Sequence, residues 1–451
     1  MTWRLGRGGQ ARAPGLLAHP GFRRLWAGQT VSVFGSEVTA LALPLAAVLV
    51  LHASTFQVGL LTTATYAAFL GIGLPAGAWV DRLRRRPVMI AADLLRAAVL
   101  VSIPVAAGLG RLTLVQLYLV ALVHGVGTVF FDVAYMSYLP GLVGRDRLVG
   151  AYAKLEVSQA VVRVSGPSFG GVLVGLLTAP VAFLADTASF LVSVASLGVI
   201  RDPEPAPEVP AGGRRPLAAE VSEGLRFVLG HPILRMIAGA TSTANFFGSA
   251  WIALSVVFLV RQVGLSPSAI GALTSAGAAG GVLGALVAVR LARTLGSARV
   301  IWVSLSVCAP FLLLLPLTFP GPGLALWAAG TFADSFGAVV YNVNQASYRQ
   351  LLCPPGLLGR MNATMRFIVW GTLPLGALVG GALGGWLGNR SGLWVAVIGS
   401  TLSPLWLVLS PLRGMRDVDT SPGPGATDGG QLDLDADEPV GTSCDWPTRS
   451  A

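Results

Sequence analysis

Two carboxylic acids, Glu37 and Asp334, lie deep within long apolar stretches of the sequence. At about 1.5 Å per helical residue, each lies roughly 15 to 20 Å inside its stretch, near the middle of a hydrocarbon core about 30 Å thick. An ionisable side chain at that depth is costly and usually has a function. We therefore predict that Glu37 and Asp334 carry protons or contact a cationic substrate.

Other charged residues fall within the same kind of stretch. Glu156 and Arg163 are seven positions apart, so they share a helical face; they could bind substrate or form a structural pair. Asp93 and Arg96, three positions apart, are predicted to neutralise each other in a structural role. Asp186 is only about five residues from the outer end of its stretch, so we expect water to reach it.

The remaining polar residues point to no cofactor chemistry. Asn245 and Asn342 could hydrogen-bond a ligand or join neighbouring helices, which is the commoner role of such amides. The four histidines have no metal-ligand spacing, and the sequence contains no phosphate loop of the GxxxxGK[ST] type. No arrangement of a nucleophile and a base is visible. We therefore expect no metal, no cofactor and no enzymatic activity, and an ATP-driven pump is disfavoured.

The elements that must hold these groups are twelve long apolar stretches, in a chain that is 53% hydrophobic and 12% charged. Backbone groups in lipid must be bonded within their own segment, so stretches of about 20 residues are interpreted as helices. A shift of 210 positions aligns residues of the two halves, in the pairs Ser137/Ser347, Tyr138/Tyr348, Gly170/Gly380 and Gly171/Gly381. We predict an all-α membrane protein with twelve transmembrane helices in two pseudo-symmetric six-helix bundles and a substrate site between them.

The chain has a net charge of +10, and its basic residues lie mainly outside these stretches. Of the 31 Lys and Arg residues, 25 lie in the terminal segments and in alternate connections. This alternation is typical of cytoplasmic loops rather than of nucleic-acid binding. We predict that both termini are cytoplasmic and that the partners are membrane lipid, protons and a small molecule, with no nucleic acid. The excess of Arg over Lys, with 57 Gly, suggests a GC-rich genome and hence a bacterial inner membrane.

Composition divides the chain into five parts. A basic cytoplasmic arm, 1–22, precedes the first bundle, 23–200. A linker rich in Pro and charge, 201–232, includes an amphipathic helix expected on the membrane surface. The second bundle, 233–412, is followed by an acidic tail, 413–451, which is predicted to be disordered and cytoplasmic.

The connection between the second and third stretches reads GAWVDRLRRR. It resembles the signature loop GxxxDRxGRR of the major facilitator superfamily, with Arg84 in place of the second Gly. The resemblance implies a latch that holds one conformation of a transport cycle, with basic residues paired to acids on neighbouring helices. The residues implied in the latch are Gly77, Asp81, Arg82, Arg85, Arg86 and Asp132.

A second motif, GPSFGG, lies in the fifth stretch. It resembles the core of a motif associated with the exporter branch of the same superfamily, although two upstream positions that are usually Gly are Ala153 and Val162 here. Pro can bend a helix and small residues allow tight packing against a neighbour. The motif favours export over uptake. Its residues are Gly166, Pro167, Gly170 and Gly171.

Longer segments, at 130–143, 223–235, 341–350 and 359–367, resemble the subgroup that includes macrolide-efflux proteins and the enterobactin exporter. The resemblance implies that the first and tenth helices line a central cavity. It predicts a secondary transporter, functional as a monomer, that works by alternating access. The expected activity is export of a hydrophobic or amphipathic molecule, such as a macrolide or a natural product or siderophore, in exchange for protons. The alternatives are an uptake symporter of the same fold and a non-transporting membrane interaction protein.

Overall fold

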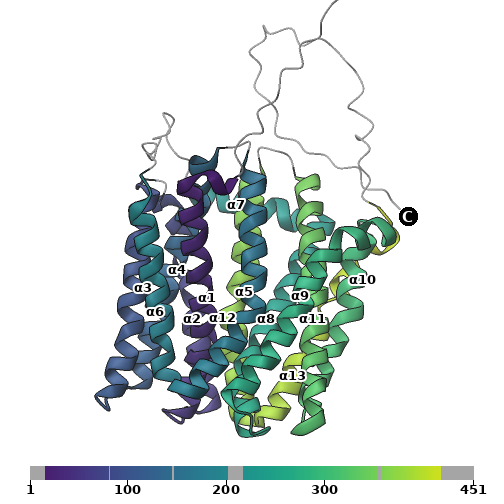
Figure 1. Cartoon of the computed structure of the whole chain (residues 1–451). Coiled ribbons are helices and arrows are strands. Elements are labelled where there is room, and N and C mark those ends of the chain that lie inside the picture. The colour runs from purple at the N-terminus through teal and green to yellow at the C-terminus, as the bar shows by residue number, and fades with distance from the viewer. Residues whose placement is uncertain (1–15, 81, 145–146, 202–216, 354–356, 418–451) are drawn as a thin grey trace, which may run out of the picture. The chain divides into compact units, whose positions relative to one another are not determined.

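The computed structural model describes residues 16–80, 82–144, 147–201, 217–353 and 357–417. These residues belong to one compact unit that ends at Asp417, so most of the predicted acidic tail lies outside the described residues. Twelve helical segments are long and apolar enough to cross a membrane (Figure 1). The predicted fold class is therefore confirmed.

Six spans precede the linker and six follow it. The first six are α1 (Pro20–Leu49), α2 (Thr55–Val80), α3 (Arg85–Gly108), α4 (Leu114–Val143), α5 (Leu148–Leu177) and α6 (Ala179–Val199). The short helix α7 (Leu217–Gly230) comes between the halves. The second set contains α8 (Pro232–Arg261), α9 (Pro267–Leu295), α10 (Arg299–Cys308), α11 (Leu324–Leu352), α12 (Leu358–Leu387), α13 (Asn389–Thr401) and α14 (Leu405–Val408). The ninth span begins as α10 and continues as a 3-10 helix, Ala309–Leu317.

The first helix of each half begins with the same cap. The Nδ1 atom of His19 accepts a hydrogen bond of 3.2 Å from the backbone N–H of Phe22, and Pro20 follows at the first helical position. In the second half, Nδ1 of His231 accepts from the backbone N–H groups of Ile233 and Leu234, at 3.3 and 3.4 Å. Proline suits the first helical position because its missing N–H would have no intrahelical partner there. The repeated His-Pro cap supports the predicted duplication of a six-helix unit.

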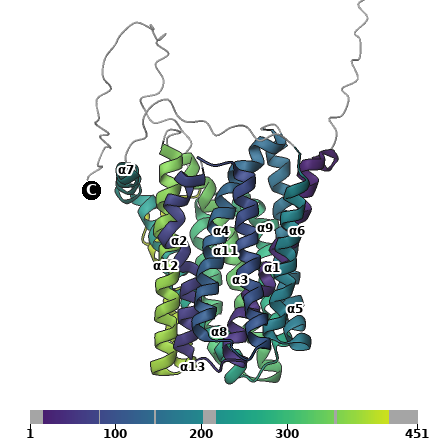
Figure 2. The same cartoon turned by 90° about the vertical axis from the view of Figure 1, so that its left-hand side faces the viewer.

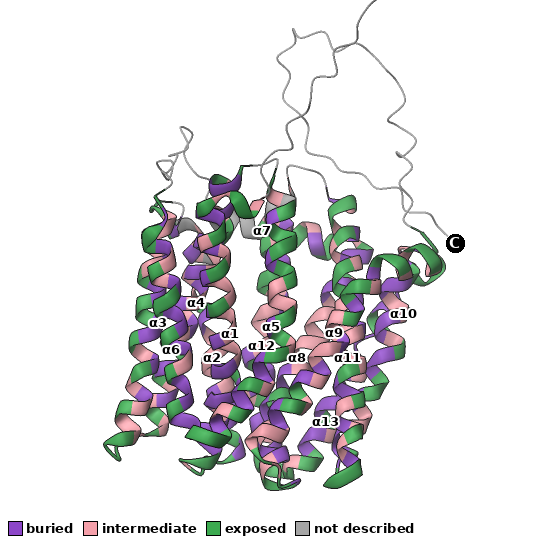
Figure 3. Ribbon diagram, in the orientation of Figure 1, coloured by how far each residue is buried: buried purple, intermediate pink, exposed green. Residues whose placement is uncertain are grey.

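Many large apolar residues are exposed. Exposed positions, green in Figure 3, recur along the length of the helices. Trp386 is 85% exposed, and Leu176 and Leu286 are 78% and 76% exposed. Large exposed apolar surfaces mark contact with a partner or a membrane. On helices of this length, lipid is the medium that matches these faces.

The two halves meet through two helix pairs, α2 with α12 and α5 with α9 (Figures 1 and 2). At each contact two glycines face each other. A Cβ atom on Gly59 would lie 2.5 Å from the Cα of Gly381, and one on Gly171 would lie 3.1 Å from the Cα of Gly271. Both contacts lie near the starts of α2 and α9, at the end of the bundle opposite α7. Because glycine has no side chain, the backbones of the two halves approach closely at this end.

We predict that Gly59→Ala separates the halves at this end. The added methyl group meets the backbone of Gly381, which cannot rotate aside, so overpacking costs about 1 to 3 kcal/mol in this conformation. Spin labels at the exposed residues Ser54 and Leu387 should show longer distances than in the parent protein.

Gly73→Ala is the matched control on the same helix, because nothing lies within 4 Å of its added Cβ. Equal distance distributions for the two variants would show that the glycine contact does not limit the approach of the halves.

Candidate substrate cavity and charged groups

A cavity of about 480 Å³ lies between the two halves, with walls formed mainly by α1, α2, α4, α8, α9 and α11. Its lining is largely apolar and includes the aromatic side chains of Tyr66, Trp251 and Trp327. Polar groups are few, namely Glu37, His124 and several Ser and Thr hydroxyls. Cavities of roughly 300 to 1,000 Å³ with apolar walls and a few polar groups are typical of small-molecule sites.

Glu37 is the one acid on this wall among the described residues. Asp334 occupies a different position: its neighbours Thr331 and Ser335 line the cavity, whereas Asp334 itself does not. The structure therefore does not bring the two predicted acids together. The two acids lie at a similar depth along their helices, but Glu37 lies on a helix face that lines the cavity and Asp334 does not.

The glycine motif of α5 shapes the surroundings of Glu37. A Cβ atom on Gly166 would lie 2.6 Å from the Cβ of Glu37, and one on Gly170 would lie 3.1 Å from the Cα of Val38. Gly171 faces α9 on the other side, and Pro167 lines the cavity. The four motif residues thus pack α5 between α1 and α9, next to the carboxylate.

Arg163 lies one turn before the motif in α5. Its Nη2 atom is 3.9 Å from Oε2 of Glu156 and donates a hydrogen bond of 3.0 Å to Gln159. The side chains of Arg163 and Glu156 are 54% and 69% exposed, so this pair is open rather than buried. Exposed pairs of this kind contribute little to stability.

The two predicted amides are not on the cavity wall. The Nδ2 atom of Asn245 donates a hydrogen bond of 3.1 Å to the carbonyl of Val369, which joins α8 to α12. Asn342 is exposed. The contact of Asn245 matches the helix-joining alternative.

The predicted latch residues are distributed over two places. Asp81 lies outside the described residues. Arg86 donates through Nε to the carbonyl of Leu197 and through Nη2 to that of Gly198, at 2.8 and 2.7 Å. Arg86 therefore ties the start of α3 to the end of α6, while Arg82 is exposed.

Gly77 and Asp132 line a smaller cavity, of about 290 Å³, between α2, α4 and α12. Arg366 of α12, in the opposite half, lies on the wall of the same cavity. The guanidinium carbon of Arg366 is 4.6 Å from the ring centroid of Trp370. Asp132 thus faces a cation of the other half across this cavity.

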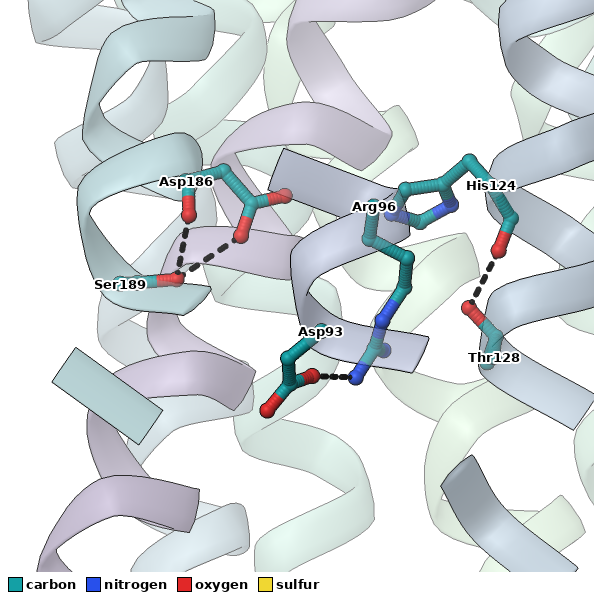
Figure 4. A network of polar contacts seen from close by, with 6 residues as sticks. All are labelled: Asp93, Arg96, His124, Thr128, Asp186 and Ser189. Atoms are coloured by element: carbon teal, nitrogen blue, oxygen red, sulfur yellow. Dashed lines mark hydrogen bonds and ion pairs between the residues drawn. The ribbon is translucent and has the colours of Figure 1, made fainter. Parts of the chain in front are cut away.

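The prediction that water reaches Asp186 is wrong. Its side chain is fully buried, because α6 packs against both α1 and α3, and it accepts hydrogen bonds from Thr39 at 2.5 Å and Ser189 at 2.9 Å. The predicted pairing of Asp93 and Arg96 is confirmed, and both are buried (Figure 4).

Sequence reasoning missed His124, which lines the cavity beside this buried group. Its ring centroid is 5.8 Å from that of Phe190, the ring that also covers the guanidinium of Arg96. The only signal in the sequence was a single histidine within an apolar stretch. Such a residue does not reveal which way its side chain points.

The sequence is similar to known proteins over most of its length. A family model described as transmembrane secretion effector matches residues 11–441. The enterobactin exporter of Salmonella typhi is 28% identical over 418 residues, which cover 89% of this chain and 95% of the exporter. That of Escherichia coli O157:H7 (strain EC4115 / EHEC) is 29% identical over 443 residues, covering 92% and 97%.

Solved structures share the fold. A bacterial homologue of the human lysosomal transporter Spinster, in an inward-facing and unoccupied conformation, superposes with a TM-score of 0.68 at 16% identity, covering 88% of this chain and 97% of the other. A bacterial homologue of the iron transporter ferroportin, in an inward-facing state, gives a TM-score of 0.66 at 16% identity, covering 86% and 98%.

We predict that Gly166→Ala destabilises the protein and weakens transport, because the new methyl group overlaps the Cβ of Glu37. Overpacking of this kind costs about 1 to 3 kcal/mol, and the midpoint of thermal unfolding should fall. Gly150→Ala, in the same helix, has nothing within 4 Å of its Cβ and serves as the control. Equal midpoints for the two variants would contradict the proposed packing of Glu37 on Gly166.

Proposed function

Because the chain belongs to the transmembrane secretion effector family of major facilitator transporters, we propose that it exports a hydrophobic or amphipathic small molecule in exchange for protons. A multi-pass membrane transporter is not an enzyme, and its substrate is a small molecule. Candidate substrates are macrolide-like drugs, cationic dyes and natural products, including siderophores, since the relatives above are enterobactin exporters.

The observation that carries the proposal is a single carboxylate, Glu37, on the wall of a drug-sized apolar cavity. The aromatic side chains around it suit an apolar body, and the carboxylate suits either a proton or a cationic group on the substrate. Competition between the two at one site couples their movements, because each favours a different occupancy of the same carboxylate.

The direction that we propose is export, which the GPSFGG motif and the relatives above favour. The basic connections predict that the end that carries α7 is cytoplasmic. The glycine pairs bring the two halves together at the opposite end in this conformation. Alternating access then requires the α2–α12 and α5–α9 contacts to open and the cytoplasmic end to close.

Closure of the cytoplasmic end involves the smaller cavity. Asp132 and Arg366 lie on facing halves there, so closure brings opposite charges together. We expect this pair to stabilise the outward-open state, in addition to the contacts of the signature loop.

We predict that Glu37→Gln abolishes coupling. In everted membrane vesicles with an energised proton gradient, transported compounds from a panel of macrolides, siderophores and cationic dyes should collapse the gradient in the parent protein. The amide can neither bind nor release a proton in this range, so the collapse should be lost. Glu223→Gln, in α7 and outside the spans, removes a carboxylate that pairs with Arg360 at 2.7 Å instead of facing the cavity, and this control should keep the collapse.

Collapse that persists in Glu37→Gln would remove Glu37 as the proton carrier. Substrate loss from the vesicle interior, rather than accumulation, would favour uptake in place of export.

We further predict that Arg366→Asp lowers the outward-open population by at least several-fold, because two carboxylates then face each other. Adding Asp132→Arg restores opposite charges and should recover much of the loss. The readout is the distance between spin labels across the cytoplasmic end. A double variant no better than the single one would argue against a direct pairing.

A further inference from the structure

A second group of charges lies inside the N-terminal half, away from the cavity that holds Glu37. Asp93 and Arg96 of α3 and Asp186 of α6 are 0%, 4% and 0% exposed (Figure 4). Arg96 bonds to Asp93 through Nη2 and Oδ1. We call these three residues the buried triad.

The triad contains two carboxyl groups and one guanidinium, so it carries an excess negative charge when both acids are ionised. Two aromatic rings cover Arg96, since its guanidinium carbon is 4.2 Å from the centroid of Phe190 and 4.6 Å from that of Phe131. An uncompensated charge inside a membrane bundle is costly. One proton bound to one of the two acids removes that excess.

Asp186 is the acid better suited to hold the proton. Asp93 has Arg96 as a direct partner, whereas the hydrogen bonds of Asp186 come from the hydroxyls of Thr39 and Ser189. A hydroxyl can donate to a carboxylate or accept from a carboxylic acid, so these partners serve both protonation states.

The surrounding elements contribute few other titratable groups. From α4 come His124, which lines the central cavity, and Asp132, which lines the smaller cavity together with Arg366 of the other half. From α1 comes Glu37, which faces the central cavity. None of these donates a hydrogen bond to Asp186 within the described part of the chain.

The triad has a connection to the central cavity. Thr39 lines the cavity and donates to Asp186, and it lies two residues after Glu37 on the same helix. His124 also lines the cavity, and its buried Nε2 atom has no hydrogen-bond partner among the described residues. A hydroxyl passes a proton by accepting one and releasing its own.

We propose that Asp186 in the buried triad is a second proton-binding site, loaded from the central cavity through Thr39. The inference rests on the proposed proton-coupled export and deepens it, because the transporter then binds one proton at Glu37 and another at Asp186. When Asp186 binds a proton, Thr39 changes from donor to acceptor in their hydrogen bond. Because Thr39 and Glu37 belong to the same helix, this change alters a contact of the helix that carries Glu37.

Infrared difference spectroscopy of the purified full chain, between acidic and alkaline pH, tests the site directly. A protonated carboxyl group has a carbonyl stretch that a carboxylate lacks. We expect Asp186→Asn to lose one such band, Asp186→Glu to keep it at a shifted frequency, and Ser189→Ala to keep it. Asp93→Asn removes the same excess charge, so the conservative variants identify the acid that holds the proton. A band that survives in Asp186→Asn, or that shifts in Asp93→Glu and not in Asp186→Glu, would overturn the assignment. If Asp186→Asn does not fold, the shift in Asp186→Glu decides.

The route is tested by exchange of the same carboxyl proton for deuterium. We expect Thr39→Ala to slow this exchange several-fold relative to the parent protein, and an unchanged rate would overturn the route through Thr39. These spectra need neither substrate nor gradient. If the vesicle assay shows no proton-coupled export while the Asp186 band is present, the proposed function fails and the proton site stands.

Discussion

Close approach of backbones at glycine positions is the constraint on which the rest of the structure depends. Lipid gives little hydrophobic drive for one transmembrane helix to join another, so helices associate where small residues let dispersion contacts form. Gly59 with Gly381 and Gly171 with Gly271 meet that need at two related places, next to the cavity between the halves. The same helix α5 also supplies Gly166, next to the carboxylate that gives the cavity its chemistry.

The helix count and the division into halves could be predicted from the sequence because both follow from hydropathy and length, which are properties of single segments. The GPSFGG motif was likewise visible, since its residues lie within two turns of one helix. Its partner Gly271 was not, because a glycine in an apolar stretch has no local signature of the helix that it will contact. Contacts between segments more than 100 residues apart are set by packing, not by local spacing.

The charged residues illustrate the same limit. Depth along the membrane could be estimated for Glu37, Asp334 and Asp186 by counting residues. The helix face on which each side chain lies could not be predicted, because the surroundings of a face depend on which helices pack against it. That face decides whether a side chain lines the cavity or lies inside the bundle. Asp186 lies near one end of its span and is nevertheless sealed, since α1 and α3 pack on both sides of it.

The contact between Gly166 and Glu37 also has an evolutionary side. A Cβ atom at position 166 would overlap the Cβ of residue 37, which every residue except glycine carries, so the steric need for Gly166 does not depend on the carboxylate. In a lineage that abandons protons as its energy source, the acid can therefore be replaced while the glycine persists. Loss of the acid at position 37 beside a retained glycine at position 166 would record a change of energy source with the helix packing kept.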